Sequence, residues 1–255
     1  MFSRLLATFS FFTRLPFWRL AELKKEDYQR VVPFWPLAGW ITGGTMALTF
    51  WGASFVLPLP VAVVLAVVAR MMVTGALHED GFADFFDGFG GGRDRQTILR
   101  IMKDSHIGTY GVLGLILYLA LLAGALLSLE PRTAALVILA ADPYAKMVAA
   151  QLILMMPYAR KEEEAKAKTV YRKFDVVTGI SLAIQGLLPL GLFLWLTGIS
   201  WEMVIFLPCI VMYFLYLLMW RKIHGYTGDC CGATFLLVEL AVYLVICLQF
   251  HLASL

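Results

Sequence analysis

Charged residues are scarce in this chain. Asp, Glu, Lys and Arg make up only 15% of its 255 residues, whereas soluble domains contain about a quarter. Hydrophobic residues make up 60%, and the mean hydropathy is +0.78. This composition excludes an ordinary soluble enzyme domain and indicates a protein that crosses a membrane several times.

Cysteine is also sparse, and no Cys-x-x-Cys pair occurs. The four cysteines are Cys209, Cys230, Cys231 and Cys247. Neither a disulfide framework nor a zinc site is supported by this spacing. A Walker A sequence is missing as well, because no Gly-Lys-Ser or Gly-Lys-Thr follows the glycine-rich stretch at 88–92.

Long apolar runs are plentiful. A membrane-spanning helix needs about 20 apolar residues, and seven runs approach that length, at about 34–57, 59–77, 108–129, 133–156, 176–197, 202–220 and 233–252. The N-terminal segment is apolar but carries Arg4 and Arg14 and lacks a cleavage site, which predicts an interfacial helix rather than a signal peptide. We therefore expect one all-α domain over 1–255, a polytopic bundle of about seven transmembrane helices.

The basic residues are strongly asymmetric. Of the 21 Lys and Arg residues, 18 fall on one side of these spans, in the segments 1–33, 78–107, 157–175 and 221–232. The positive-inside rule predicts that these long loops face the cytoplasm. The loop at 159–174 is expected to be a solvated charged loop, with a mobile flap over a cytoplasmic site as the alternative.

The stretch "HEDGFADFFDGFGGGRDR" at 78–95 concentrates carboxylates next to an apolar span. On a helix, the spacing i, i+4, i+7 places three aspartates on one face, Asp80, Asp84 and Asp87. Four phenylalanines fall on the opposite face, Phe82, Phe85, Phe86 and Phe89. Like charges on one face repel, so a divalent cation such as Mg²⁺ is favoured over an exposed acidic face.

Glycines and basic residues follow this acidic helix. Gly88, Gly90, Gly91 and Gly92 are expected to break the helix and expose backbone N–H groups to an anion. The basic residues Arg93, Arg95, Arg100 and Lys103 come next. Metal, amides and guanidinium groups together predict a pyrophosphate site.

Further polar positions are of interest, and two of them allow two interpretations each. Asp104 either caps the next helix or adds a metal ligand. Asp142 and Lys146, four residues apart inside a span, form an ion pair, or Lys146 contacts a substrate phosphate. Asp229 lies in a glycine-containing turn that suggests a second ligand-binding turn.

Five motifs in order resemble the cobalamin synthase family. They are "FFTRLP" at 11–16, "FWPLAGWITG" at 34–43, the acidic stretch at 78–95, "IMKDSHIGTYG" at 101–111 and "GYTGDCCGA" at 225–233. Members of this family are adenosylcobinamide-GDP ribazoletransferases. The resemblance covers nearly the whole chain, and its central motif is specific.

The resemblance implies a Mg²⁺-dependent integral membrane enzyme of bacteria or archaea. Together with the charge asymmetry, it predicts an enzyme of the cell inner membrane with its active site facing the cytoplasm. It would join adenosylcobinamide-GDP and α-ribazole, or its 5′-phosphate, and release GMP. The implied site positions are His78, Asp80, Asp84, Asp87, Asp104 and Asp229. Membrane lipid is the other expected partner, nucleic acid is not one, and homo-oligomerisation is left open.

Combined with the residue patterns, these expectations define the predicted site. His78, Asp80, Asp84 and Asp87 are the predicted catalytic residues, and Asp80, Asp84, Asp87 and Asp104 the predicted metal ligands. The predicted substrate-binding residues are Gly90, Gly91, Arg93, Arg95, Lys103 and Asp229. The chain departs from the family pattern at Glu79, Lys103 and His106, where an apolar residue and two arginines are usual.

Two other classes compete with this function. Asp84, Asp87 and Gly88 match the opening of the motif of CDP-alcohol phosphotransferases, which form phosphodiesters from CDP-lipids. A secondary transporter would instead place acidic residues at the bilayer midplane. Release of CMP or GMP separates the two enzymes, and uptake without turnover would identify a transporter.

Overall fold

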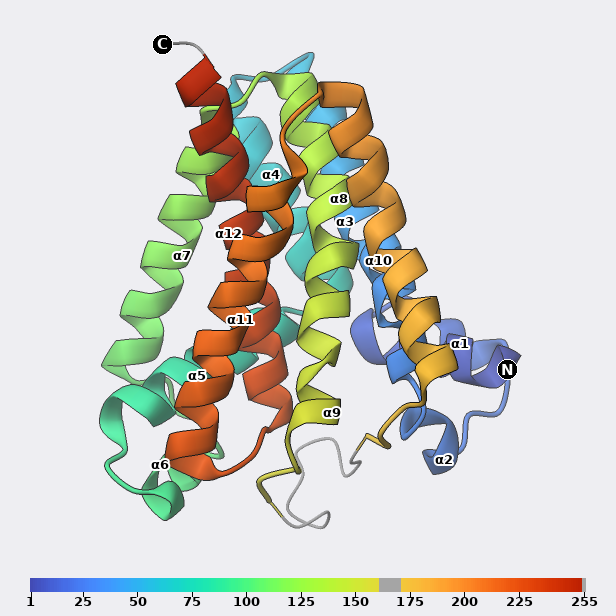
Figure 1. Ribbon diagram of the computed structural model, residues 1–255, viewed down its shortest axis with the longest axis vertical. Helices are drawn as coiled ribbons and strands as arrows, with labels where there is room; N and C mark the ends of the chain where they lie inside the picture. Colours follow the sequence, from blue (N-terminus) through green and yellow to red (C-terminus); the bar gives the residue numbers. More distant parts are fainter. Residues whose placement is uncertain (161–170, 254–255) are drawn as a thin grey trace.

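The computed structural model describes residues 1–160 and 171–253 and is almost entirely helical there (Figure 1). The long helices are α3 (Trp35–Ser54), α4 (Leu59–Thr74), α7 (Thr109–Leu127), α8 (Pro131–Ala150), α10 (Val176–Thr197), α11 (Trp201–Ile223) and α12 (Gly228–Ala253). They run alternately up and down and form one bundle (Figure 1). The all-α prediction is confirmed.

The remaining elements are shorter. They are α1 (Phe2–Phe12), the 3₁₀ turns η1 (Phe17–Arg19) and η2 (Val32–Phe34), α2 (Lys25–Tyr28), α5 (Leu77–Gly91), α6 (Arg95–Ile101) and α9 (Leu152–Met155). Helices α1, α2, α5, α6 and α9 gather at one end of the bundle (Figure 1). The described parts of the four segments that are rich in Lys and Arg also lie at this end.

The structure gives five or six candidate spans, against about seven in the prediction. Within the described residues, five helices are long and apolar enough to cross a membrane, and a sixth span arises if α4 and α5 count as one. Helix α3 has the required length but is not among them. Its sequence includes four glycines and four threonines or serines in place of aliphatic residues, and two of those glycines serve packing.

Helices α8 and α12 form the centre of the bundle. In both, 78% of the apolar window is buried, against 22–33% in α7, α10 and α11. Exposed aliphatic and aromatic side chains on those three outer helices, such as Leu117, Ile184 and Phe214, suit contact with lipid. Their exposure is the pattern expected of a multi-pass membrane protein.

Glycines allow α3 to lie directly against α8. A Cβ atom on Gly39 would lie 2.8 Å from backbone atoms of Pro143, and one on Gly43 would lie 2.8 Å from the Cβ of Asp142. This close approach lets Thr42, between the two glycines, donate a 2.7 Å hydrogen bond to Asp142. Small residues spaced four apart commonly pack membrane helices in this way.

A sharp break separates α4 from α5. Gly75 and Ala76 both adopt left-handed backbone conformations, with φ of 65° and 55°, and the two helix axes differ by 92°. Glycine adopts this conformation without steric cost, which explains its place at the end of α4. The break turns α5 across the end of the bundle, where it meets the start of α12.

Candidate functional site

A pocket of about 320 Å³ opens between α5 and α12 at the end of the bundle that carries the charged segments. It brings together three of the predicted site residues, His78 and Asp80 from α5 and Asp229 from the first turn of α12. The sequence alone could not predict this contact, because about 150 residues separate Asp80 from Asp229. The site is therefore a contact between two helices rather than one continuous motif.

Glycines make the crossing of α5 and α12 close enough to build the pocket. A Cβ atom on Gly81 would lie 3.0 Å from the Cα of Asp229, and one on Gly232 would lie 3.4 Å from the backbone oxygen of His78. Both glycines also line the pocket. Larger residues at either position would push the two helices apart and separate Asp80 from Asp229.

Aromatic side chains line a large part of the pocket wall. His78 stacks on Phe12 with ring centroids 5.7 Å apart and contacts Phe235 at 4.5 Å. Trp35 makes an edge contact with Tyr171 at 5.3 Å. His78 Nε2 and the indole nitrogen of Trp35 are buried and have no hydrogen-bond partner among the described residues.

Two tyrosines at the pocket remain neutral hydroxyl groups. Burial raises the pKa of Tyr158 to about 12, and the nearby Arg160 opposes that shift. Burial also raises the pKa of Tyr171 well above its usual value. Both side chains therefore present O–H groups rather than phenolates at physiological pH.

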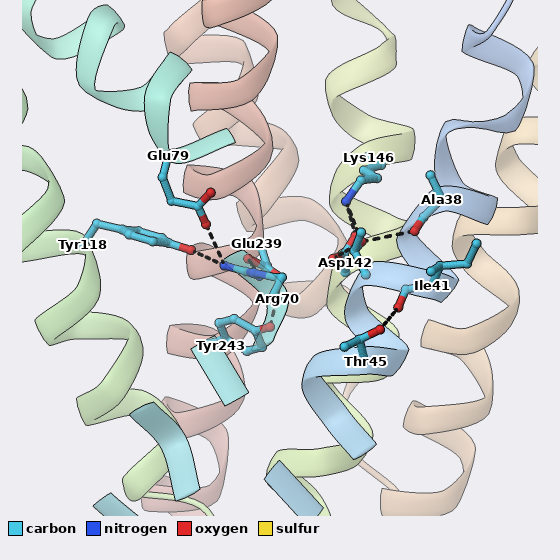
Figure 2. Close-up of polar contacts among 11 residues, drawn as sticks. Ala38, Ile41, Thr45, Arg70, Glu79, Tyr118, Asp142, Lys146, Glu239 and Tyr243 are labelled. Carbon is cyan, nitrogen blue, oxygen red and sulfur yellow. Dashed lines mark hydrogen bonds and ion pairs between the residues drawn. The ribbon is translucent and has the colours of Figure 1, made fainter. Parts of the chain in front are cut away.

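Lys146, which lines the pocket, makes several polar contacts within the bundle. Lys146 pairs with Asp142 on the same helix and donates a 3.1 Å hydrogen bond to Thr42 of α3. Its ammonium group also lies 3.8 Å from the centroid of the Phe235 ring. The predicted ion pair between Asp142 and Lys146 is confirmed, and Figure 2 shows both side chains between α8 and α3.

A second buried charge cluster lies beside the pocket and joins four helices (Figure 2). Arg70 of α4 donates to both carboxylate oxygens of Glu239 on α12 at 2.8 Å and to the hydroxyl of Tyr118 on α7 at 2.9 Å. Tyr243 donates to the same Glu239 at 3.0 Å. Glu79 of α5 lies 3.7 Å from Arg70, and no hydrogen bond to its oxygens is present among the described residues.

Asp87 has a structural partner of its own. Its two carboxylate oxygens accept the backbone N–H groups of Gly108 at 2.7 Å and Gly111 at 2.8 Å. Asp87 thus caps the N-terminus of α7 from a neighbouring helix, in the manner of a side-chain N-cap. Asp84, which is half-buried and one turn after Asp80, does not line the pocket.

The predicted glycine loop is wrong. Helix α5 continues through Gly91, so the N–H groups of Gly90 and Gly91 lie within the helix instead of facing an anion. The glycines serve close packing, since a Cβ atom on Gly90 would lie 2.6 Å from the ring of Tyr110. The helical spacing of the acidic residues was compatible with a helix that continues into the glycines, but the run of glycines led to the prediction of a loop.

The remaining predicted residues lie outside the pocket. Arg95 donates to the backbone oxygens of Ile223 at 3.0 Å and Ala159 at 2.6 Å. Arg93 and Lys103 are exposed. Asp104 is also exposed; its hydrogen bonds with His106 lower the pKa of its carboxyl group, and it does not cap α7, whose N-cap is Gly108.

The donor set of the pocket fits Mg²⁺. Within the described residues, no three His, Cys, Asp or Glu side chains form a metal-binding group. Two carboxylates, Asp80 and Asp229, nevertheless line one pocket from two helices. Mg²⁺ prefers oxygen ligands and is often held by one or two carboxylates together with substrate phosphates and water.

Several pocket residues escaped the sequence-based prediction. Phe12, Trp35, Tyr158, Arg160 and Tyr171 line the pocket from segments far apart in the chain. The only signal in the sequence was their place in or near the N-terminal motifs and the charged loop. Residues 161–170 of that loop lie outside the described residues, and so does the choice between a solvated charged loop and the alternative of a mobile flap.

A second cavity of about 440 Å³ adjoins the first at the break between α4 and α5. It shares Phe11, Leu77 and Asp80 with the first pocket. Arg14 and the hydroxyl residues Ser10, Thr13 and Thr74 also line it. Asp80 therefore lies where an aromatic pocket and a polar cavity meet.

The fold and the site define a class of protein, a multi-pass helical membrane protein with a carboxylate-lined pocket at one end of the bundle. The family model described as cobalamin-5-phosphate synthase matches residues 4–247. The chain belongs to this family. No solved structure matches it.

Relatives named adenosylcobinamide-GDP ribazoletransferase resemble the chain over most of its length. The protein of Shewanella frigidimarina is 37% identical over 241 residues, covering 93% of this chain and 91% of the relative. That of Shewanella woodyi is 35% identical, covering 92% of each chain. That of Shewanella putrefaciens is 34% identical, covering 94% and 92%.

Proposed function

We propose that this chain is a membrane transferase of cobalamin synthesis that acts on adenosylcobinamide-GDP. The second substrate is α-ribazole or its 5′-phosphate, and the products are adenosylcobalamin, or its 5′-phosphate, and GMP. The observation that carries the proposal is the pocket in which Asp80, Asp229 and His78 meet. Family membership and the printed names of the relatives give the substrate that carries GDP.

The reaction is a displacement at phosphorus. The 3′-hydroxyl oxygen of α-ribazole bonds to the phosphorus that is attached to the aminopropanol arm of the corrinoid. The bond from this phosphorus to the bridging oxygen breaks, and GMP leaves with that oxygen. The hydroxyl proton passes to His78 or to one of the two carboxylates, which line the pocket where the acceptor would lie.

Mg²⁺ is the cofactor of this proposal, with Asp80 and Asp229 as its protein ligands. When bound, the ion neutralises charge on the diphosphate and on the leaving phosphate. The side chains themselves position the substrates, since the glycine-mediated crossing fixes the distance between the two helices. Positioning and charge neutralisation are the main needs of such a phosphoryl transfer.

The orientation follows from the charge distribution. The site lies at the end of the bundle that carries most of the Lys and Arg residues, so we place it at the cytoplasmic face of the inner membrane. Membrane lipid surrounds the exposed faces of α7, α10 and α11. A large corrinoid then approaches from the cytoplasm without crossing the bilayer.

The test is an assay of the purified protein in lipid nanodiscs. Adenosylcobinamide-GDP, α-ribazole and Mg²⁺ should give GMP and the joined corrinoid in equal amounts, and EDTA should stop the reaction. The control replaces the corrinoid by a CDP-lipid with an alcohol acceptor, from which no CMP should appear. Release of CMP without GMP would instead identify a lipid-forming phosphotransferase.

A further inference from the structure

Two adjoining cavities of different chemistry meet at Asp80. The first is walled by six aromatic side chains, Phe11, Phe12, Trp35, Tyr158, Tyr171 and Phe235. The second contains Arg14 and three hydroxyl residues and has a more polar character. A reaction between two substrates needs two subsites that meet at the reacting atoms.

We infer that the cavities divide the substrates between them. The aromatic pocket takes the flat base of the ribazole nucleoside, and the Arg14 cavity takes the nucleoside diphosphate. The phosphorus to be attacked then lies beside Asp80, at the junction of the two cavities. This inference rests on the proposed function, because it assigns the two substrates of that reaction.

The size of the aromatic pocket and the chemistry of its wall favour binding of the ribazole base there. A volume of about 320 Å³ suits a nucleoside and is far too small for a corrin ring with its side chains. The base of ribazole is an apolar bicyclic ring with one free ring nitrogen that accepts, and it has no N–H donor. Rings of this kind stack on aromatic side chains, which contribute about 1–3 kcal/mol per base.

The indole of Trp35 supplies the complementary donor. Trp35 is 3% exposed, lines the pocket, and has no hydrogen-bond partner for Nε1 among the described residues. An indole N–H only donates, so its matching group is a ring nitrogen that accepts. Guanine also has acceptors, O6 and N7, but it carries N–H donors that the ribazole base lacks.

The second cavity suits an anion. Arg14 follows α1, and its guanidinium lies against Gly75 at the break between α4 and α5. The hydroxyl oxygen of Ser10 is buried without a hydrogen-bond partner among the described residues. An arginine with neighbouring hydroxyl groups recognises phosphate by charge-assisted hydrogen bonds.

Two-substrate kinetics in nanodiscs test this division with two variants. Trp35→Phe keeps an aromatic ring but removes the N–H, and it should raise KM for α-ribazole about 3- to 10-fold, as expected for one hydrogen bond. Its KM for adenosylcobinamide-GDP should stay unchanged. Arg14→Gln should instead raise KM for adenosylcobinamide-GDP about 10-fold or more and leave KM for α-ribazole unchanged.

Control variants and a product complete the test. Trp18→Phe and Arg19→Gln change exposed residues of the same types outside both cavities and should leave both KM values unchanged. GMP should inhibit competitively against adenosylcobinamide-GDP and not against α-ribazole. An inverted pattern, or both variants acting on one substrate, would overturn the division while turnover continues. Absence of turnover in the unaltered protein would overturn the proposed function instead.

Discussion

Arg70 and Glu239 form an ion pair that is buried in the bundle and joins α4 to α12. Arg70 is 1% exposed and Glu239 is inaccessible, and both carboxylate oxygens lie 2.8 Å from one guanidinium nitrogen. Charges inside a membrane protein are costly unless they are paired. The pair therefore fixes α12, and with it Asp229, relative to the break that turns α5.

Removing one partner of this pair should destabilise the protein strongly. Glu239→Ala leaves Arg70 with Glu79 at 3.7 Å as its nearest carboxylate, and we expect a loss of about 3–5 kcal/mol in the free energy of unfolding. The double variant Arg70→Met with Glu239→Leu should regain much of that loss. Thermal unfolding in detergent measures both, with Glu22→Ala as an exposed control. Equal losses in the single and double variants would contradict this account.

The two pocket carboxylates should be essential for turnover. Asp80→Asn and Asp229→Asn each remove one charge from the proposed Mg²⁺ site, and each should lower kcat/KM at least ~100-fold, by analogy with the loss of one electrostatic contact at a transition state. GMP release at several Mg²⁺ concentrations measures the effect. Asp84→Asn tests the wider predicted ligand set, because a folded variant with near-normal turnover would remove Asp84 from it.

Variants of Asp87 can distinguish a structural role of this residue from a catalytic role. Asp87→Ala leaves two N–H groups at the start of α7 without their acceptors, and loss of such a cap costs about 1–2 kcal/mol of stability. Asp87→Asn retains one acceptor oxygen and should recover part of this stability together with measurable activity. Full stability of Asp87→Asn with complete loss of GMP release would instead support the predicted metal ligand.

The contact between α3 and α8 offers a matched pair of glycine substitutions. Gly39→Ala forces a Cβ against the backbone of Pro143, and overpacking of this kind costs about 1–3 kcal/mol. Gly52→Ala lies on the same helix, where a Cβ atom meets nothing within 4 Å. It should leave stability unchanged or raise it by up to ~1 kcal/mol, since alanine favours a helix. Denaturation midpoints that fall equally for both would refute close packing at Gly39.

Hydrophobic run length and charge asymmetry predicted the helical bundle and the end that carries the site. Helical spacing grouped Asp80 with Asp84 and Asp87, but of these three only Asp80 lines the pocket, and His78 was predicted from the family resemblance alone. The same spacing could not reveal that Asp87 faces α7, because an N-cap supplied by another helix leaves no local pattern. The glycines at 88–92 were interpreted as a loop, whereas α5 continues through Gly91 and Gly90 packs against Tyr110.

Contacts between residues that are far apart in the sequence could not be predicted either. The meeting of Asp80 with Asp229, and of Arg70 with Glu239, depends on how helices cross rather than on local periodicity. Arg14 was interpreted only as an interfacial charge, since the cavity it lines appears only when α4 bends away from α5. Five separated motifs thus carried the family resemblance, and the fold supplies the reason that they belong together.

Because the site needs both α5 and α12, it can form only late in the synthesis of the chain. About 150 residues must be synthesised after Asp80 before Asp229 has been added, which takes roughly 7–30 s at 5–20 residues per second. Four long helices, α7, α8, α10 and α11, enter the membrane during that interval. A nascent chain halted anywhere before α12 lacks Asp229, so we expect catalytic competence to report that membrane insertion has been completed.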